Sequence, residues 1–375
     1  DIGGHMLGGS DDTMAARWFQ LGCFSPINRL HSSNSGFTSK EPWRYSRDAR
    51  ATMDAHLRLR HRLVPYLYTW ARRSAGEGIA PVRPVYHDHP RELAAYEHRG
   101  SFSFGDLLVV PFTSPLDVAT GLGRELTWLP DGVWYDLPTG RRYEATTGGR
   151  GRMLSLSRPL DRIGVLARAG SVIPLAGNLT EAAGDNPREL EIVVVPGGSG
   201  SFTLEEDDGS AQPGQDQIAR THMALTWPDA EEEDGADVVL RIRLEGAAEV
   251  VPASRLVTVR LLAGQVAGAW LGVGERARRL ATEEVSGDGF TLGAGTLVHL
   301  EELSRQELID GVQLVLRGTK HSPADWRDEV HAILDAARVE YMAKDLAWDA
   351  VQRGLSGTAL LGELEALGLP ETLRA

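Results

Sequence analysis

The chain has 375 residues, of which 42% are hydrophobic, and a formal net charge of -13. This length exceeds that of one ordinary domain, so we expect two or three domains, each with its own core. The acidic balance argues against nucleic acid or an anionic membrane surface as the main partner, because both attract basic proteins. A neutral or cationic small molecule suits the charge better, and the absence of any apolar run of about eighteen residues predicts no transmembrane helix.

The chain opens with Asp1-Ile2-Gly3-Gly4, a pattern typical of a strand that ends in a sharp turn beside a ligand. A short apolar segment over residues 23–31 predicts a buried strand that carries Arg29 and His31 to its C-terminal end. With a helix between them, these strands form a β/α repeat, and polar residues at such strand ends meet substrate in a (β/α)8 barrel. Cys23 is the only cysteine, which excludes an internal disulfide, and its apolar neighbours predict a buried, unreactive thiol.

Two helices are predicted in this first part. One spans about residues 11–22 and has apolar residues at helical spacing, namely Met14, Trp18 and Leu21. The other runs from Arg47 to about Ala75, and Pro65 should kink it. Its remaining surface is strongly basic, with Arg58, Arg60 and Arg62, and we interpret it as a solvated face rather than a nucleic-acid patch.

Beyond about residue 80 the sequence changes to short β-rich runs separated by Gly and Pro. Strands are predicted at 107–111, 125–129, 133–137, 163–167 and 171–174, a spacing typical of an antiparallel sandwich. A second all-β unit follows, with strands at 189–196, 201–204, 238–244, 256–262, 266–271 and 296–300. From residue 304 the apolar residues recur at helical intervals, starting with Leu308, Val312 and Val315, and this predicts a helical tail.

Acidic and histidine-containing clusters outside the first part are assigned to structure rather than to metal sites. The residues 205–208 and 231–234 are interpreted as turns, and His87-Asp88-His89 as a turn before Pro90. Glu329 and Asp325 near a predicted helix start are explained by the helix dipole and capping.

Several segments, taken in order, resemble glycoside hydrolase family 31, the family of α-glucosidases and α-xylosidases. These segments are residues 1–4, 17–22, 24–33, 40–43 and 60–68, and further on 104–111, 128–135, 168–174 and 205–209. The resemblance implies the end of a (β/α)8 barrel over 1–80, a proximal antiparallel β-sandwich over 81–180 and a distal one over 181–303. The tail over 304–375 lies outside it.

The resemblance implies retaining α-glycoside hydrolysis by two carboxylates, a nucleophile and a general acid/base. In the family both lie upstream of the motif at Asp1, so we expect them outside this chain, which also lacks an initial Met and looks like a fragment. No Gly-x-Ser-x-Gly elbow, phosphate loop or Cys-x-x-Cys pair supports another chemistry.

The intact protein is therefore expected to be a cytoplasmic enzyme that removes terminal α-linked glucose from oligosaccharides, with no cofactor, metal, nucleic acid or membrane partner. An α-xylosidase or transglycosylase of the same family stays open as an alternative. A non-catalytic β-sandwich protein that binds carbohydrate or serves as a scaffold is the competing hypothesis, and a homo-oligomer stays open.

The residues carried over from the family form the sugar-binding floor. Asp1 matches a pocket carboxylate, and His31 matches a histidine that hydrogen-bonds a sugar hydroxyl. Arg29 is expected on the other side of its strand, holding Asp1 or a neighbouring carboxylate in an ion pair. His5 and Met6 stand where the family lines the leaving-group side. Trp43 covers the pocket or packs in the core, and both readings stay open.

Overall fold

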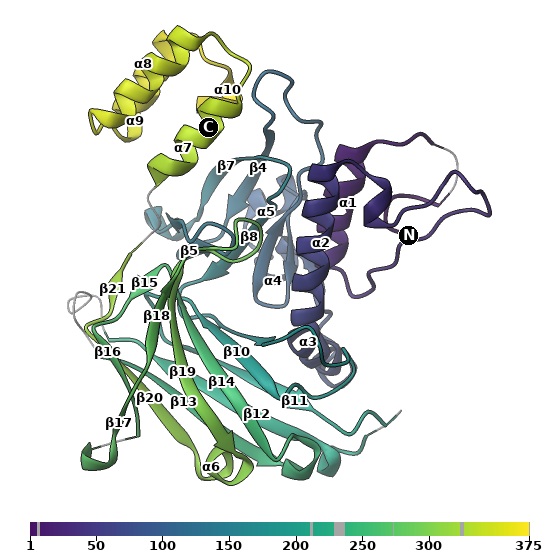
Figure 1. Ribbon diagram of the computed structural model, residues 1–375, viewed down its shortest axis with the longest axis vertical. Coiled ribbons are helices and arrows are strands. Elements are labelled where there is room, and N and C mark those ends of the chain that lie inside the picture. Colours follow the sequence, from purple (N-terminus) through teal and green to yellow (C-terminus); the bar gives the residue numbers. More distant parts are fainter. Residues whose placement is uncertain (6–7, 211–212, 229–236, 273, 323–325, 375) are drawn as a thin grey trace.

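A computed structural model describes residues 1–5, 8–210, 213–228, 237–272, 274–322 and 326–374. The chain forms a helical N-terminal part, two β-sheet units and a separate group of helices near the C-terminus (Figure 1). Within the described ranges, no helix combines the length and apolarity needed to cross a membrane.

The N-terminal part consists of three α-helices and a short 3-10 helix: α1 (Asp12–Cys23), η1 (Pro42–Arg44), α2 (Arg47–Arg62) and α3 (Val64–Glu77). Asp11 caps α1, because its carboxylate accepts a hydrogen bond from the Met14 amide at 2.8 Å. Both predicted helices are confirmed, and the break between α2 and α3 comes at Leu63, two residues before Pro65.

The apolar residues at helical spacing in α1 do not form its buried face. Met14 and Trp18 are 48% and 37% exposed, whereas Ala15, Ala16 and Phe19 are buried. The small alanine side chains allow α2 to pack closely on that face, so packing rather than side-chain size selects it.

The strand predicted over residues 23–31 is also wrong, because α1 continues to Cys23 and the chain beyond it is irregular. Only Leu30 pairs, in an isolated parallel bridge with Ile2. A parallel strand needs neighbours along its length, and here Ile2 is the single partner among the described residues. Cys23 is fully buried as expected, and burial raises the pKa of its thiol to about 12.

The basic surface of α2 and α3 is not simply solvated, which corrects that prediction. Arg60 donates to the carbonyl groups of Cys23, Ser25 and Pro26 and so holds the irregular segment after α1. Arg62 forms an ion pair at 2.9 Å with Glu191 in the distal β-sheet unit. These two arginines join parts of the fold, whereas Arg58 is exposed.

The proximal β unit has a six-stranded sheet and a two-stranded ribbon, and all its strand pairs are antiparallel. The sheet order is β1 (Val82–Pro84), β2 (Phe102–Phe104), β3 (Leu107–Val110), β8 (Gly164–Arg168), β5 (Val133–Asp136) and β6 (Arg142–Glu144). The ribbon pairs β4 (Gly123–Leu129) with β7 (Arg152–Arg158), and the short helices are α4 (Val85–Asp88) and α5 (Leu93–Glu97). His87 and Asp88 thus lie in a helical turn.

The distal β unit packs a five-stranded sheet against a six-stranded one. The first has the order β18 (Thr282–Val285), β19 (Gly295–Ser304), β14 (Ser254–Leu262), β10 (Glu189–Val194) and β9 (Val172–Ala176). The second has the order β11 (Gly200–Glu206), β12 (Ala219–Thr226), β13 (Val238–Gly246), β20 (Val312–Arg317), β16 (Gly268–Leu271) and β17 (Arg278–Leu280). A small ribbon of β15 (Gly264–Gln265) and β21 (Lys320–His321) and the helix α6 (Arg305–Asp310) complete it.

Strand pairing differs from the sequence prediction at both edges of this unit. β9 lies in the range predicted for the proximal sandwich but pairs with β10, so pairing favours a boundary near residue 170 over one near 180. Val312 and Val315 lie in β20, between β13 and β16, so the helical pattern predicted from residue 304 is wrong there. β10 and β14 run parallel, an exception to the predicted antiparallel order. The predicted turn at 231–234 lies outside the described residues.

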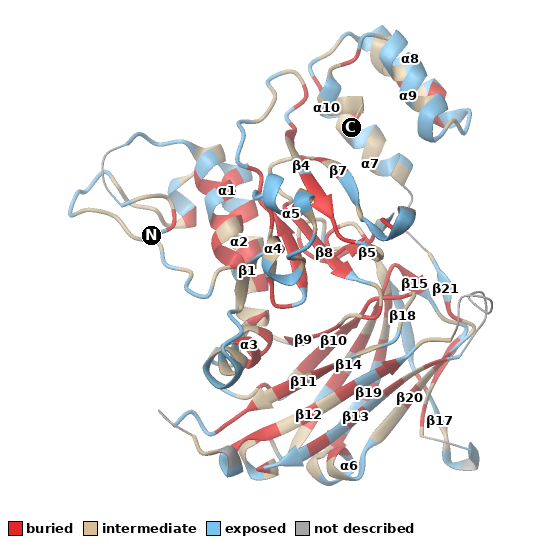
Figure 2. Ribbon diagram, turned by 180° about the vertical axis from the view of Figure 1, so that it is seen from behind, coloured by how far each residue is buried: buried red, intermediate tan, exposed pale blue. Residues whose placement is uncertain are grey.

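The core is continuous from the N-terminal helices through both β units (Figure 2). β3 is buried on both faces: Leu108 and Val110 pack with the β4–β7 ribbon, whereas Leu107 and Val109 belong to the core shared with α3 and the distal sheets. Such two-sided burial explains why this strand reads as an uninterrupted apolar run.

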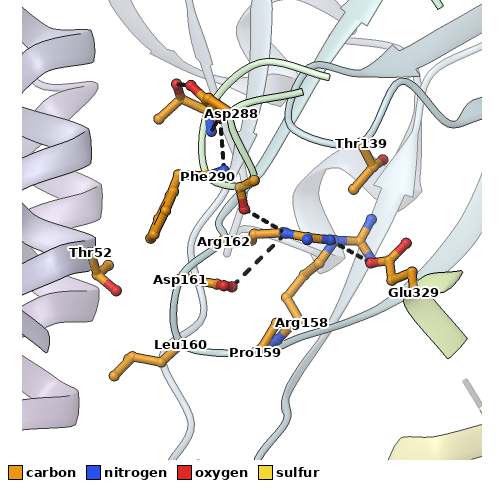
Figure 3. A network of polar contacts seen from close by, with 12 residues as sticks. Thr52, Thr139, Arg158, Pro159, Leu160, Asp161, Arg162, Asp288, Phe290 and Glu329 are labelled. Carbon is orange, nitrogen blue, oxygen red and sulfur yellow. Dashed lines mark hydrogen bonds and ion pairs between the residues drawn. The ribbon is translucent and has the colours of Figure 1, made fainter. Parts of the chain in front are cut away.

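The C-terminal tail, residues 326–374, contains α7 (Trp326–Ala336), α8 (Tyr341–Gln352), α9 (Gly357–Ala366) and α10 (Glu371–Arg374), with a small core of its own. The tail docks on the proximal β unit. Glu329 of α7 accepts from Arg141 and Arg162 of the proximal unit, each at 2.6 Å (Figure 3). Glu329 is therefore more than a dipole partner, and Asp325 lies outside the described residues.

The loop 158–162 links the tail to the N-terminal helices. Arg17 of α1, which is 7% exposed, donates to the carbonyl groups of Arg158, Pro159 and Arg162 at 2.5 to 3.1 Å. Burial lowers the pKa of Arg17 to about 10, so it still carries its charge at neutral pH. Figure 3 shows this loop between α2 and Glu329, with Arg162 reaching toward the tail.

We expect Glu329→Gln to loosen the tail, because it removes the charge from two half-buried ion pairs with Arg141 and Arg162. A loss of about 1 kcal/mol would speed proteolytic cleavage within residues 326–374 roughly fivefold. Asp328→Asn is the control, since Asp328 lies in the same helical turn but is exposed. Equal cleavage rates in the two variants would contradict the role of the Glu329 ion pairs in holding the tail.

His56 on α2 is a buried neutral histidine. Its side chain is fully buried, its Nδ1–H donates to the Thr52 carbonyl at 2.8 Å, and its Nε2 has no hydrogen-bond partner in the described structure. Burial lowers the pKa of His56 to about 4, while Asp288 acts in the opposite direction and Arg17 in the same one.

The unfolded chain therefore binds more protons than the folded chain between pH 6.5 and about 4, and stability falls as the pH falls through this window. Below about pH 4, the neutral burial of His56 lowers the free energy of unfolding by about 3 kcal/mol relative to pH 7. Urea unfolding of wild type and His56→Met at pH 7 and pH 4.5 tests this, with His222→Gln, at a half-buried histidine of β12, as control. An unchanged pH dependence in His56→Met would refute it.

Candidate functional site

The site is built where the first residues of the chain meet the segment after α1. The Ile2 amide donates to the Arg29 carbonyl at 2.9 Å, and the bridge to Leu30 runs parallel. Ile2 is buried with Leu30 against α1 and α2. Burial of these two apolar side chains turns the polar residues on either side of them, Asp1, Arg29 and His31, toward one surface.

A cluster of four polar side chains gathers on that surface, and Asp1 is at its centre. Arg29 donates to Asp1 Oδ1 from Nε at 3.1 Å and from its Nη2. The Nδ1 atoms of His5 and His31 lie 3.2 and 3.1 Å from Asp1 Oδ2. We call Asp1, His5, Arg29 and His31 the Asp1 cluster.

The predicted ion pair between Arg29 and Asp1 is present, but the expectation that Arg29 points away from His31 is wrong. Both side chains contact the same carboxylate. In an extended chain, residues two apart share a face, so this common direction follows from the backbone itself.

The turn after Asp1 depends on two glycines. Gly3 and Gly4 have φ values of 83° and 76°, a region that other residues rarely adopt. The turn brings His5 back to Asp1, and the rings of His5 and His31 meet edge to face with centroids 4.2 Å apart. Desolvation, then the neighbouring His5 and Arg29, lower the pKa of His31, which favours its neutral form at neutral pH.

Lys40 is a structural member of the site that sequence reasoning missed. Its ammonium group donates to the carbonyl groups of Gly3 at 3.0 Å and His31 at 2.7 Å, so it ties the two segments of the Asp1 cluster together. Partial burial lowers its pKa. Its place directly before Glu41-Pro42 was part of the resemblance, but nothing local in the sequence shows which carbonyl groups it meets.

A hollow of about 320 Å³ opens beside the cluster at His5. It is lined by Gly3, Gly4, His5, the residues 8–11, Met14, Ala15, the residues 37–40, Arg44 and Tyr45. Trp43 is 65% exposed, so core packing is wrong for it, and it is absent from this lining. Met6 lies outside the described residues.

The Asp1 cluster can hydrogen-bond hydroxyl groups but cannot by itself perform two-carboxylate hydrolysis. Retaining glycosidases place two carboxyl groups about 5 Å apart. The cluster contains one carboxylate, and both of its oxygens are engaged with Arg29, His5 and His31. The imidazole and carboxylate groups of the cluster are donors and acceptors of the kind that hydroxyl groups can meet.

Comparisons with known proteins match this architecture. Residues 1–70 match the TIM-barrel domain of glycosyl hydrolases family 31, and residues 78–173 match the C-terminal domain of the same family. An α-xylosidase of Saccharolobus solfataricus is 30% identical over 240 residues, which cover 62% of this chain and 31% of that protein. Lysosomal α-glucosidase of Mus musculus is 27% identical over 258 residues, which cover 64% of this chain and 26% of that protein.

A solved structure gives the same likeness for the fold. A family 31 dextranase of Flavobacterium johnsoniae aligns with a TM-score of 0.63 at 19% identity, over 82% of this chain and 37% of the dextranase. The chain thus spans between about a quarter and somewhat more than a third of the length of these relatives.

Proposed function

Because residues 1–70 and 78–173 of this chain belong to glycoside hydrolase family 31, we propose that it is part of a retaining α-glycosidase that removes terminal α-linked glucose from oligosaccharides. The Asp1 cluster forms part of the floor that holds the sugar. The nucleophile and the general acid/base come from the portion of the full-length protein that precedes Asp1.

The observation that carries this proposal is the convergence of donors and acceptors at Asp1. A sugar ring presents adjacent hydroxyl groups, each of which both donates and accepts. His31 Nδ1 and Asp1 Oδ2 lie 3.1 Å apart, so a single pair of neighbouring hydroxyl groups can reach both side chains. Arg29 holds the carboxylate in place, which lowers the cost of ordering it when the sugar binds.

The sequence motifs and one relative point to different sugars. Ser32-Ser33-Asn34 and the segment 40–43 resemble α-glucosidases more than α-xylosidases, whereas the relative with 30% identity is an α-xylosidase. The two sugars differ by one hydroxymethyl group, and the side chains that accept or reject it belong to the proposed catalytic portion before Asp1. We therefore keep α-xylosidase as the second candidate.

The first test uses chromogenic α-glucoside and α-xyloside with the full-length protein and with the 375-residue chain alone. We expect the full-length protein to prefer the α-glucoside by at least about tenfold in kcat/KM, a difference of about 1.4 kcal/mol, and the chain alone to be inactive. Preference for the α-xyloside would select the second candidate. Inactivity of the full-length protein toward both substrates, or turnover by the chain alone, would overturn the proposal.

His31→Ala in the full-length protein should lower kcat/KM, with a loss of transition-state stabilisation of roughly 2–4 kcal/mol. This follows if the bond from His31 to the sugar tightens in the transition state. The control is His61→Ala on α2, a histidine outside the cluster. Thermal unfolding of both variants verifies that the fold is kept. A loss of less than about threefold in kcat/KM would remove His31 from the site.

A further inference from the structure

Three ligand atoms of the kind that bind transition metals converge in the Asp1 cluster. They are Asp1 Oδ2 and the Nδ1 atoms of His5 and His31, and all three lie within 4.8 Å of one another. Each histidine nitrogen is within 3.2 Å of the carboxylate oxygen. Two imidazoles and one carboxylate are a common protein donor set for zinc.

The separations of 3.2 and 3.1 Å between nitrogen and oxygen are those of hydrogen bonds, and they are also close to the spacing of donors around one metal ion. Zinc bonds to nitrogen and oxygen of about 2.0–2.2 Å in tetrahedral geometry place donors about 3.3–3.5 Å apart. The observed separations of 3.2 and 3.1 Å between nitrogen and oxygen differ from this by a few tenths of an ångström. We propose that Asp1, His5 and His31 bind one zinc-class transition-metal ion, with the fourth position open, and that this ion excludes the sugar.

The donor types select the class of metal. Imidazole nitrogen suits zinc, copper, nickel and cobalt, whereas magnesium and calcium take oxygen ligands almost throughout. With a single carboxylate, this set should discriminate strongly against the two hard cations.

The surroundings preorganise the donors and also limit their affinity. Arg29 engages Oδ1 of Asp1, which leaves Oδ2 for the metal, and Lys40 fixes the backbone of Gly3 and His31. The positive charges of these two side chains oppose a dication. We therefore expect binding weaker than at a four-ligand structural zinc site, which suits a reversible inhibitor rather than a resident cofactor.

His5 is the residue that distinguishes a metal site from a sugar floor. Asp1 and His31 suffice to meet a pair of hydroxyl groups, but two donors make a poor zinc site, and the turn at Gly3 and Gly4 supplies the third. His5 is 44% exposed in its side chain, so the ion can enter from solvent.

The inhibition rests on the proposed function, whereas the binding does not. A metal held by Asp1 Oδ2 and His31 Nδ1 occupies the atoms that would otherwise meet the sugar hydroxyls. Sugar and metal then exclude each other, and zinc raises the apparent KM of the full-length enzyme without changing kcat.

The test is calorimetric titration of zinc chloride into the 375-residue chain with a short Gly-Ser leader and no histidine tag, so that the terminal amine of Asp1 supplies no ligand. We expect one zinc ion per chain, no binding of magnesium, and the visible absorption of tetrahedral cobalt when cobalt replaces zinc. His5→Phe should weaken zinc binding at least tenfold.

His222→Phe is the matched control. His222 is a half-buried histidine 3.5 Å from the carboxylate of Glu245, but it lies in the distal unit away from the cluster. Unchanged zinc affinity in His5→Phe, or no binding by the wild-type chain, would overturn the metal site. Unchanged KM in zinc would overturn the competition with sugar, and an inactive full-length protein with the zinc isotherm intact would reject only the glycosidase proposal.

Discussion

The fold depends on one buried aromatic junction, at Tyr66 on α3. Tyr66 is 1% exposed, its ring stacks on Phe202 of the distal unit, and its hydroxyl donates to the Phe104 carbonyl and accepts from the Asp106 amide. Gly105 is required there, since a Cβ would lie 2.3 Å from the Tyr66 hydroxyl. The helices and both β units therefore share one core and cannot pack independently.

Buried ion pairs around this junction determine how the elements meet. Glu191 pairs with Arg62 of α2 and Arg260 of β14, and Glu206 receives the fully buried Arg255. The acidic segment 205–208, interpreted from sequence as a turn, contributes further pairs, because β11 extends through Glu206. Glu205 and Asp207 both pair with Arg72 of α3. Asp208 is exposed and lies in the irregular segment after the strand. Desolvation offsets much of the gain from such pairs, so we interpret them as selecting one arrangement rather than as the main source of stability.

In the Asp1 cluster, too, contacts between charged and polar side chains select one arrangement. Its backbone is set by one parallel bridge, two glycines and Lys40, and its side chains are ordered by mutual contacts at a single carboxylate. A site made of loop ends gains its precision from the packed α1 and α2 behind it. The proposed hydroxyl-binding floor and the proposed metal-binding triad use the same atoms, so competition between sugar and metal would make the site open to regulation.

The sequence alone determined the features that depend on neighbouring residues. These are the extent of α1, the break before Pro65, most strands of the two β units and the buried thiol of Cys23. It also placed Asp1 and His31 in ordered family motifs. Tertiary structure alone decided which face of α1 is buried, and that Arg60 and Arg62 join parts of the fold. It also decided that β20 completes a sheet and that Lys40 ties together the two segments of the Asp1 cluster. The reason is physical. Local periodicity and turn residues act over a few positions of the chain, whereas burial, strand partners and ion pairs are properties of residues tens or hundreds of positions apart.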